Sequence, residues 1–194
     1  MSKVASVLFG REDIRRRVEE LGRAITGDYA GREPVLVSVL KGGTVFLADL
    51  MREIHLALEV HFIAISRYGD AEESMGRVQI LLDLDVDLAE RDVLVVEDIV
   101  DTGLTLSYLL SVLSARRTAS LEVCTLLDRS VRRIAPLTPR YTGFDCPDLF
   151  VVGYGLDVDE RYRNLPAIYA VEDVRMLQED PGLLTPMLVG PDGG

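Results

Sequence analysis

The residues best suited to chemistry lie in one short segment that follows an apolar run. Glu97, Asp98 and Asp101 supply three carboxylates, and Thr102-Gly103-Leu104-Thr105 comes directly after them. A glycine turn before a helix presents backbone N–H groups and the positive end of the helix dipole, which suit a phosphate group. Carboxylates can hold sugar hydroxyls or a hard cation such as Mg²⁺. The segment therefore predicts a ligand that carries phosphate, hydroxyl groups and a divalent cation together.

This segment needs a strand before it and a helix after it. Residues 93–96 are all apolar, which indicates a strand buried on both faces, and leucines recur at helical spacing from Leu104 to Leu113. Further strands are expected at 34–40, 60–65, 78–82, 121–127 and 149–154, and further helices at 12–25 and 44–54. This alternation predicts an α/β fold with a mainly parallel sheet between helices. Ligands of such sheets bind at the carboxyl ends of the strands.

Composition and charge limit the kinds of molecule that the protein is expected to bind and its expected location. The chain has 194 residues and a formal net charge of −11, which argues against binding to nucleic acids or anionic membranes. The apolar run at 4–9 is too short for a signal peptide, and no run reaches the about 18 residues of a membrane span. Cys124 and Cys146 have no metal-binding spacing and are expected to be reduced thiols. We therefore expect a cytoplasmic protein.

Two segments interrupt the alternation of strands and helices. Residues 66–77 form a polar stretch about as long as an active-site lid, and Arg67 and Tyr68 lie near its start, close to the preceding strand. From residue 175 onward, three prolines and a terminal Gly-Gly predict a disordered tail over 175–194. The remaining residues, 1–174, are expected to form one domain.

The segment 93–106 resembles the signature of the type I phosphoribosyltransferases, which bind phosphoribosyl pyrophosphate (PRPP) through two acidic residues and a following Asp-Thr-Gly-x-Thr loop. The resemblance implies their fold, in which a small hood subdomain covers the sheet. Here the hood would come from the N-terminal helix region and residues 128–171. It also implies that PRPP binds with Mg²⁺ and contacts Glu97, Asp98, Asp101, Thr102, Gly103 and Thr105.

Two more stretches resemble the hypoxanthine-guanine phosphoribosyltransferases within that family. Lys41-Gly42-Gly43 resembles their pyrophosphate loop, in which a cis peptide often precedes the lysine, so Lys41 and Gly42 join the implied PRPP site. Residues 147–165 resemble their purine-binding end. By this resemblance Phe150 stacks on the base, the Val151 backbone reads its edge, Asp157 lies by the purine and joins Glu97 and Asp98 as a metal ligand, and Arg163 binds pyrophosphate.

The chain departs from the family pattern at two basic residues. Arg129 stands where the family usually has the lysine that bonds the purine 6-oxygen, and a planar guanidinium is no simple replacement for an ammonium group. Arg67 precedes Tyr68 where the lid usually has Ser-Tyr, and it could reach the pyrophosphate, alter lid closure or face solvent. The preference among hypoxanthine, guanine and xanthine therefore stays open.

The resemblance implies a purine-salvage enzyme that transfers 5-phosphoribosyl from PRPP to hypoxanthine or guanine, giving IMP or GMP and pyrophosphate. Asp101 is our candidate general base for the purine proton, although an aspartate before a helix also suits an N-cap. The lid would exclude water, because hydrolysis of PRPP competes with transfer. The alternatives are an enzyme with an unusual acceptor base and a PRPP- or nucleotide-sensing RNA-binding regulator. Family likeness implies a homodimer or homotetramer.

Overall fold

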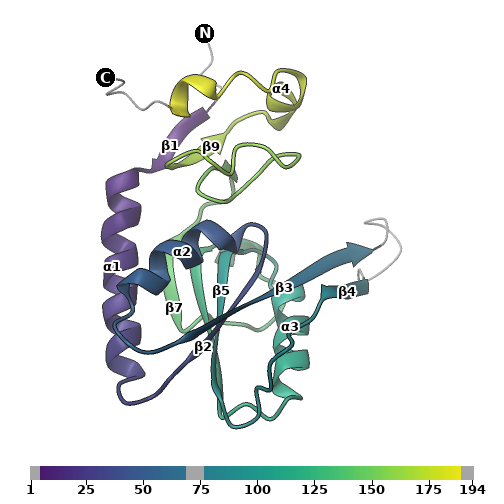
Figure 1. The fold of residues 1–194 in the computed structure, drawn as a ribbon. Coiled ribbons are helices and arrows are strands. Elements are labelled where there is room, and N and C mark those ends of the chain that lie inside the picture. Colours follow the sequence, from purple (N-terminus) through teal and green to yellow (C-terminus); the bar gives the residue numbers. More distant parts are fainter. Residues whose placement is uncertain (1–4, 69–76, 189–194) are drawn as a thin grey trace.

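The chain folds around a six-stranded sheet with strand order β4-β3-β2-β5-β6-β7 (Figure 1). The structure is a computed structural model that describes residues 5–68 and 77–188. The strands are β2 (Val35–Leu40), β3 (Glu59–Tyr68), β4 (Arg77–Leu82), β5 (Asp92–Val100), β6 (Ser120–Asp128) and β7 (Tyr141–Asp145). Neighbours from β3 to β7 pair in parallel, and β4 pairs antiparallel with β3. The predicted α/β fold with a mainly parallel sheet is confirmed.

Helices cover both faces of this sheet (Figure 1). The side chains of β5 alternate between the two faces: Leu94 and Val96 join the core formed with α1 (Arg11–Asp28) and α2 (Gly43–Glu53), whereas Val93 and Val95 join the core formed with α3 (Leu104–Ser114). Burial on both faces explains why residues 93–96 are all apolar. The central strand is therefore fixed from both sides, and its carboxyl end is a rigid support for the acidic segment.

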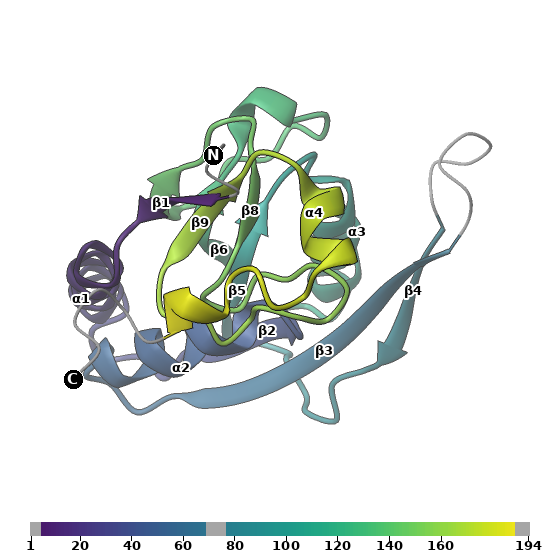
Figure 2. The same ribbon diagram turned by 90° about the horizontal axis from the view of Figure 1, so that it is seen from above.

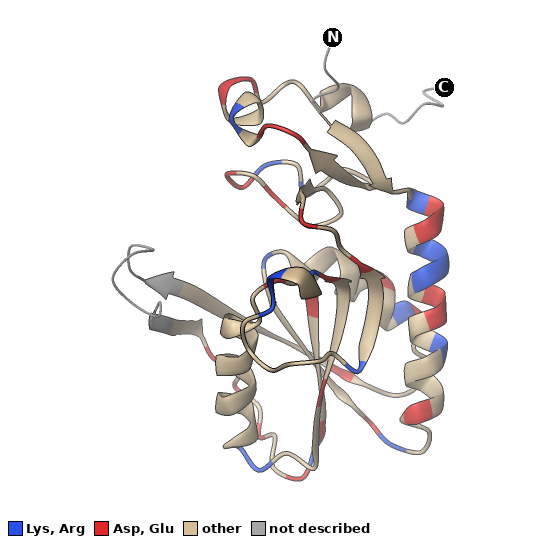
Figure 3. Cartoon of the chain, turned by 180° about the vertical axis from the view of Figure 1, so that it is seen from behind, with Lys and Arg blue, Asp and Glu red and all other residues tan. Residues whose placement is uncertain are grey.

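Helix α1 contacts the β7 edge of the sheet through Arg17 in its first half and Asp28 at its end. Arg17 donates from Nε and Nη2 to the carbonyl oxygens of Gly143 and Thr142 in β7, each at 2.7 Å. The outer face of α1 alternates basic and acidic residues (Figure 3), with ion pairs such as Arg15–Glu12 at 2.9 Å. Such exposed pairs contribute little to stability. The buried apolar face and the Arg17 contacts therefore position α1.

A second, three-stranded sheet lies beyond the carboxyl ends of the large sheet's strands and forms a hood (Figures 1 and 2). Its antiparallel order is β1-β9-β8, from β1 (Ala5–Phe9), β9 (Ile168–Val171) and β8 (Phe150–Val152). The sequence placed the hood in the N-terminal helix region and residues 128–171. In the structure the N-terminal part of the hood is a strand, while α1 and β7 pack with the large sheet. The N-terminal residues join the hood because β1 pairs with β9, a strand more than 150 residues later in the sequence.

The last described residues also belong to the hood. The sequence predicted a disordered tail from residue 175, but α4 (Val174–Glu179) and a 3₁₀ helix, η2 (Thr185–Leu188), follow β9. Asp173 caps α4 by accepting a hydrogen bond from the Arg175 N–H at 3.0 Å. Leu177 and Leu184 are buried in the hood's own core. The expectation of disorder was therefore wrong for residues 175–188, because these leucines bury despite the nearby prolines.

Strands β3 and β4 extend together beyond the rest of the sheet (Figure 2). The register pairs Arg67 with Val78 and Tyr68 with Arg77 at the end of this ribbon. Residues 69–76 of the expected lid lie outside the described part of the chain, as do the side chains of Arg67 and Tyr68, so their roles remain predictions. In the described ranges, no helix has both the length and the apolar character needed to cross a bilayer.

Candidate active site

The predicted strand, turn and helix are present between β5 and α3. Gly103 has a φ of 77°, in the left-handed region that glycine adopts without strain, and its carbonyl accepts the first helical hydrogen bond from the Ser107 N–H at 2.8 Å. Helix α3 begins at Leu104 and has 11 residues. The first N–H groups of such a helix have no partner within the helix. The turn can therefore present donors to an anion at the carboxyl end of β5.

Arg133, which the sequence analysis did not single out, holds this turn from behind. Its guanidinium donates from Nε to the Asp101 carbonyl at 3.0 Å, from Nη2 to the Val100 carbonyl at 3.3 Å, and pairs with the Asp128 carboxylate. The backbone N–H groups of residues 134 and 135 donate to the Thr102 carbonyl at 2.9 and 3.0 Å. These bonds occupy the carbonyls of the turn.

The carboxylate of Asp101 has two oxygens in different surroundings. Oδ2 lies 3.2 Å from Nη1 of Arg129 and 3.8 Å from Nη1 of Arg132. Oδ1 is buried and has no hydrogen-bond partner among the described residues. One oxygen is therefore oriented by cations while the other keeps its capacity to accept a hydrogen bond. An acceptor oxygen without a partner is one feature that a general base needs.

Arg129 links Asp101 to the start of β8. Its side chain is 7% exposed, and Nη2 donates to the Leu149 carbonyl at 2.6 Å and lies 3.8 Å from Sγ of Cys146. Leu149 directly precedes Phe150, which is 43% exposed at the first position of β8, and Val151 behind it is buried. The structure thus brings the candidate base, Arg129 and the predicted purine-stacking ring to one place. The Nε atom of Arg129 is buried without a partner in the described residues.

The loop after β2 lies against both the acidic pair and the hood. The Leu40–Lys41 peptide bond is cis, as the resemblance implied. A Cβ added to Gly42 would stand 1.7 Å from Oδ2 of Asp98, and a Cβ on Gly155 would stand 2.3 Å from the Gly42 carbonyl. A side chain at Gly155 would overlap the backbone, and one at Gly42 would require the Asp98 carboxylate or the loop to move. The two glycines allow the loop, β5 and the hood to meet.

Glu97 and Asp98 are half-buried where these elements meet. Burial raises the pKa of Glu97 well above its usual value, and the neighbouring charge of Asp98 adds to this. Burial also raises the pKa of Asp98, and the charge of Asp157 adds to it, while a hydrogen bond from the Ile99 N–H and the charge of Arg163 oppose it. Positive charge or hydroxyl donors brought by a ligand would favour the ionised form of both carboxylates. The pair is suited to a ligand with hydroxyls and a cation.

The three predicted metal ligands do not form one closed site. Among the residues that the structure describes, no three acidic, histidine or cysteine side chains gather as a metal-binding group. Asp157 instead pairs through Oδ1 with Nη2 of Arg163 at 2.9 Å. Mg²⁺ is commonly held by one or two carboxylates together with substrate phosphates and water. The donors present fit a cation that arrives with a phosphorylated ligand and do not fit a cage made by protein alone.

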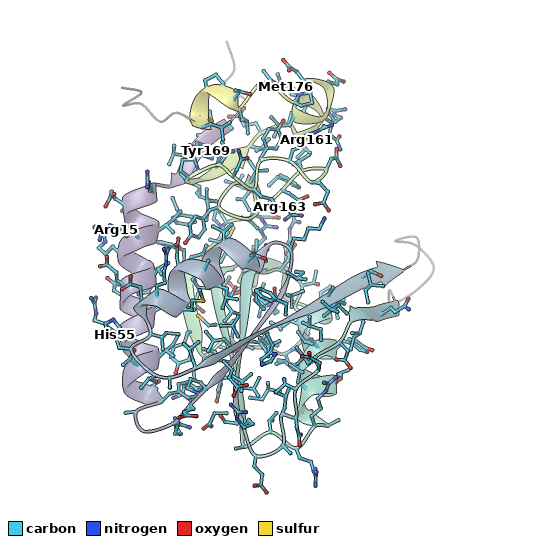
Figure 4. The ribbon with its side chains drawn as sticks, in the orientation of Figure 1. Arg15, His55, Arg161, Arg163, Tyr169 and Met176 are labelled. Atoms are coloured by element: carbon cyan, nitrogen blue, oxygen red, sulfur yellow. The ribbon has the colours of Figure 1, made fainter. Side chains whose placement is uncertain are left out.

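The two cations predicted to bind pyrophosphate are both present at the base of the hood. Nζ of Lys41 lies 3.0 Å from Oε2 of Glu160, and Nη2 of Arg163 lies 3.2 Å from the same oxygen. Arg163, labelled in Figure 4, also donates from Nη1 to the Gly155 carbonyl at 2.8 Å. A single carboxylate thus connects the two cations. Sequence reasoning did not identify Glu160, because only the folded hood brings it to Lys41.

Most of this chain is similar to proteins of known family. The model of the family described as "Phosphoribosyl transferase domain" matches residues 10–159. The hypoxanthine-guanine phosphoribosyltransferase of Bacillus subtilis is 46% identical over 165 residues, covering 85% of this chain and 92% of the relative. That of Mycobacterium avium is 49% identical over 182 residues, covering 91% and 89%. The crystal structure of a hypoxanthine-guanine phosphoribosyltransferase from Bacillus anthracis aligns with a TM-score of 0.84 at 44% identity, over 87% of this chain and 99% of that one.

Proposed function

The chain belongs to the phosphoribosyltransferase family as an enzyme of purine salvage, and we propose that it transfers 5-phosphoribosyl from PRPP to hypoxanthine, guanine or both, releasing pyrophosphate. The observation that carries the proposal is the position of Asp101. Its carboxylate lies between the anion-binding turn at Gly103 and Arg129, which contacts the strand that begins with Phe150. Donor site and acceptor site thus meet at a candidate base.

The donor half of the site is formed by the turn and the acidic pair. The N–H groups and hydroxyls of residues 102–105 would bind the 5-phosphate, and Glu97 and Asp98 would hold the ribose hydroxyls. Lys41 and Arg163 would bind the pyrophosphate group. Mg²⁺ held by Glu97, Asp98 or Asp157 with the substrate would supply neutralisation of charge on the leaving group.

The acceptor half is formed by β8 and Asp101. Phe150 would stack on the purine, the Val151 backbone would read its edge, and Asp157 would lie beside it. Asp101 would accept the ring proton through Oδ1 as the bond to the sugar forms. Arg129 orients the other oxygen of this carboxylate, and reading of the purine 6-oxygen by Arg129 stays a prediction.

The two alternative functions are not favoured by the comparisons, because the relatives described above are named as hypoxanthine-guanine phosphoribosyltransferases. Pyrophosphate release from PRPP, measured with hypoxanthine, guanine, xanthine and unrelated bases, tests the proposal. We expect release with hypoxanthine or guanine. Release only with another base would indicate the unusual-acceptor enzyme, and RNA binding without release would indicate the regulator.

Location and assembly are part of the proposal. Cys124 and Cys146 are free and buried thiols, which suits the reducing cytoplasm, where we propose that the enzyme works. Family likeness supports a homodimer or homotetramer. Light scattering coupled to size-exclusion chromatography tests the assembly, and a monomer at micromolar concentration would contradict it.

A further inference from the structure

Glu160 occupies an unusual position for an acidic residue in a site for anions. Its Oε2 atom lies within 3.2 Å of nitrogens on both Lys41 and Arg163, the cations that we propose bind pyrophosphate. A carboxylate there repels an incoming polyphosphate unless it moves. The contact of Glu160 with the two cations therefore bears on how tightly the site binds pyrophosphate.

The backbone of Glu160 is fixed, whereas its side chain is accessible. Its N–H donates to Oδ2 of Asp157 at 2.9 Å, and both Asp159 and Glu160 have left-handed φ values, of 50° and 64°. The side chains of Glu160 and Lys41 are 63% and 65% exposed. Exposed ion pairs of this kind add little to fold stability. The side chain can therefore exchange partners while the turn beneath it stays in place.

We infer that Glu160 sets the affinity of the enzyme for pyrophosphate by placing its carboxylate between Lys41 and Arg163 and leaving when the pyrophosphate group binds. The inference rests on the proposed function of these two cations. When pyrophosphate departs, the carboxylate returns and again pairs with Lys41, while Arg163 also keeps its pair with Asp157. Glu160 thus competes with the product and favours its release. It lowers affinity for pyrophosphate and for the same group of PRPP.

The test compares Glu160→Gln with a matched control, Glu179→Gln, which removes the same charge from α4. Calorimetry with pyrophosphate and Mg²⁺ measures affinity without turnover. We expect Glu160→Gln to bind pyrophosphate about two- to five-fold more tightly than wild type. The gain is small because the ion pairs that compete with pyrophosphate are exposed and therefore weak. The control should match wild type. Unchanged or weaker binding in Glu160→Gln would overturn the inference, and a merely structural role also predicts weaker binding.

A chemical readout covers the case in which Glu160→Gln folds poorly. Lys3 and Lys41 are the lysines of the chain, so peptide mapping after labelling with an amine reagent reports Lys41 separately. We expect Glu160→Asp, whose carboxylate is one carbon shorter, to label faster than wild type at Lys41, with pyrophosphate protecting both. Equal labelling rates would contradict the inference. Failure of the proposed function is distinguishable, because it would show as no pyrophosphate release by the wild type.

Discussion

The carboxylate of Asp101 lies 3.2 Å from the guanidinium of Arg129, at the point where the turn at Gly103 meets the hood. The same guanidinium donates to the Leu149 carbonyl at 2.6 Å, so one arginine connects the candidate base to the residue that precedes β8, whose Phe150 we propose stacks on the purine. Removal of either partner should therefore affect transfer to the base more than binding of PRPP.

Replacing Asp101 tests the base directly. We expect Asp101→Ala to lower kcat by about 10²-fold or more, because proton transfer loses its acceptor, while PRPP affinity changes little. Steady-state kinetics and calorimetry measure the two quantities. Asp85→Ala, at a position whose side chain is 98% exposed, is the control and should behave as wild type. An unchanged kcat in Asp101→Ala would remove this residue from the role.

Replacing Arg129 by lysine tests base preference. A single ammonium group cannot keep both the Asp101 and the Leu149 contacts, and loss of a hydrogen bond to a charged group costs about 1.5–3 kcal/mol. We expect kcat/KM for hypoxanthine to fall roughly ten-fold or more, and the ratios among hypoxanthine, guanine and xanthine to change. Equal ratios in both enzymes would show that Arg129 does not read the base.

Replacing Arg133 tests the support of the turn. Its side chain pairs with Asp128 and bonds the carbonyls of Val100 and Asp101, and it is 13% exposed. Breaking a buried pair leaves the partner charge uncompensated and costs about 3–5 kcal/mol. We expect Arg133→Met to lower the free energy of unfolding by an amount near that range and to raise KM for PRPP. Urea denaturation and kinetics provide the readouts. If Arg133→Met lowers the free energy of unfolding but leaves KM for PRPP unchanged, PRPP binding by the turn does not depend on Arg133.

Adding one methyl group at Gly42 tests the close approach of the loop to the acidic pair. A Cβ there would stand 1.7 Å from Oδ2 of Asp98, so the loop or the carboxylate must shift. We expect Gly42→Ala to weaken PRPP binding by roughly ten-fold or more, since small displacements in a positioned site are costly. Gly27→Ala in α1, where the added Cβ would meet nothing within 4 Å beyond its own stretch of helix, is the control and should bind normally. Equal affinity in both variants would contradict the predicted role of this loop.

Local sequence patterns predicted the elements that carry the site. The features that depend on contacts between residues far apart in the sequence could not be predicted. The run at 93–96, Gly103 and the leucines after it indicate strand, turn and helix within one segment, and the structure has them in that order. Strands β1 and β9 are short, and they pair across more than 150 residues, as Ala5 with Val171. Arg133 acts through backbone carbonyls that precede it by some 30 residues. No periodicity in the chain reports such contacts.

The proposed function requires that the turn at Gly103, with Glu97 and Asp98 beside it, bind PRPP. Calorimetric titration of the wild-type enzyme with PRPP in the presence of Mg²⁺ tests it most directly, with Asp101→Ala and Gly42→Ala titrated alongside. We expect saturable binding to the wild type, nearly the same affinity in Asp101→Ala, and much weaker binding in Gly42→Ala. The absence of any heat of binding with the folded wild-type enzyme would contradict the account.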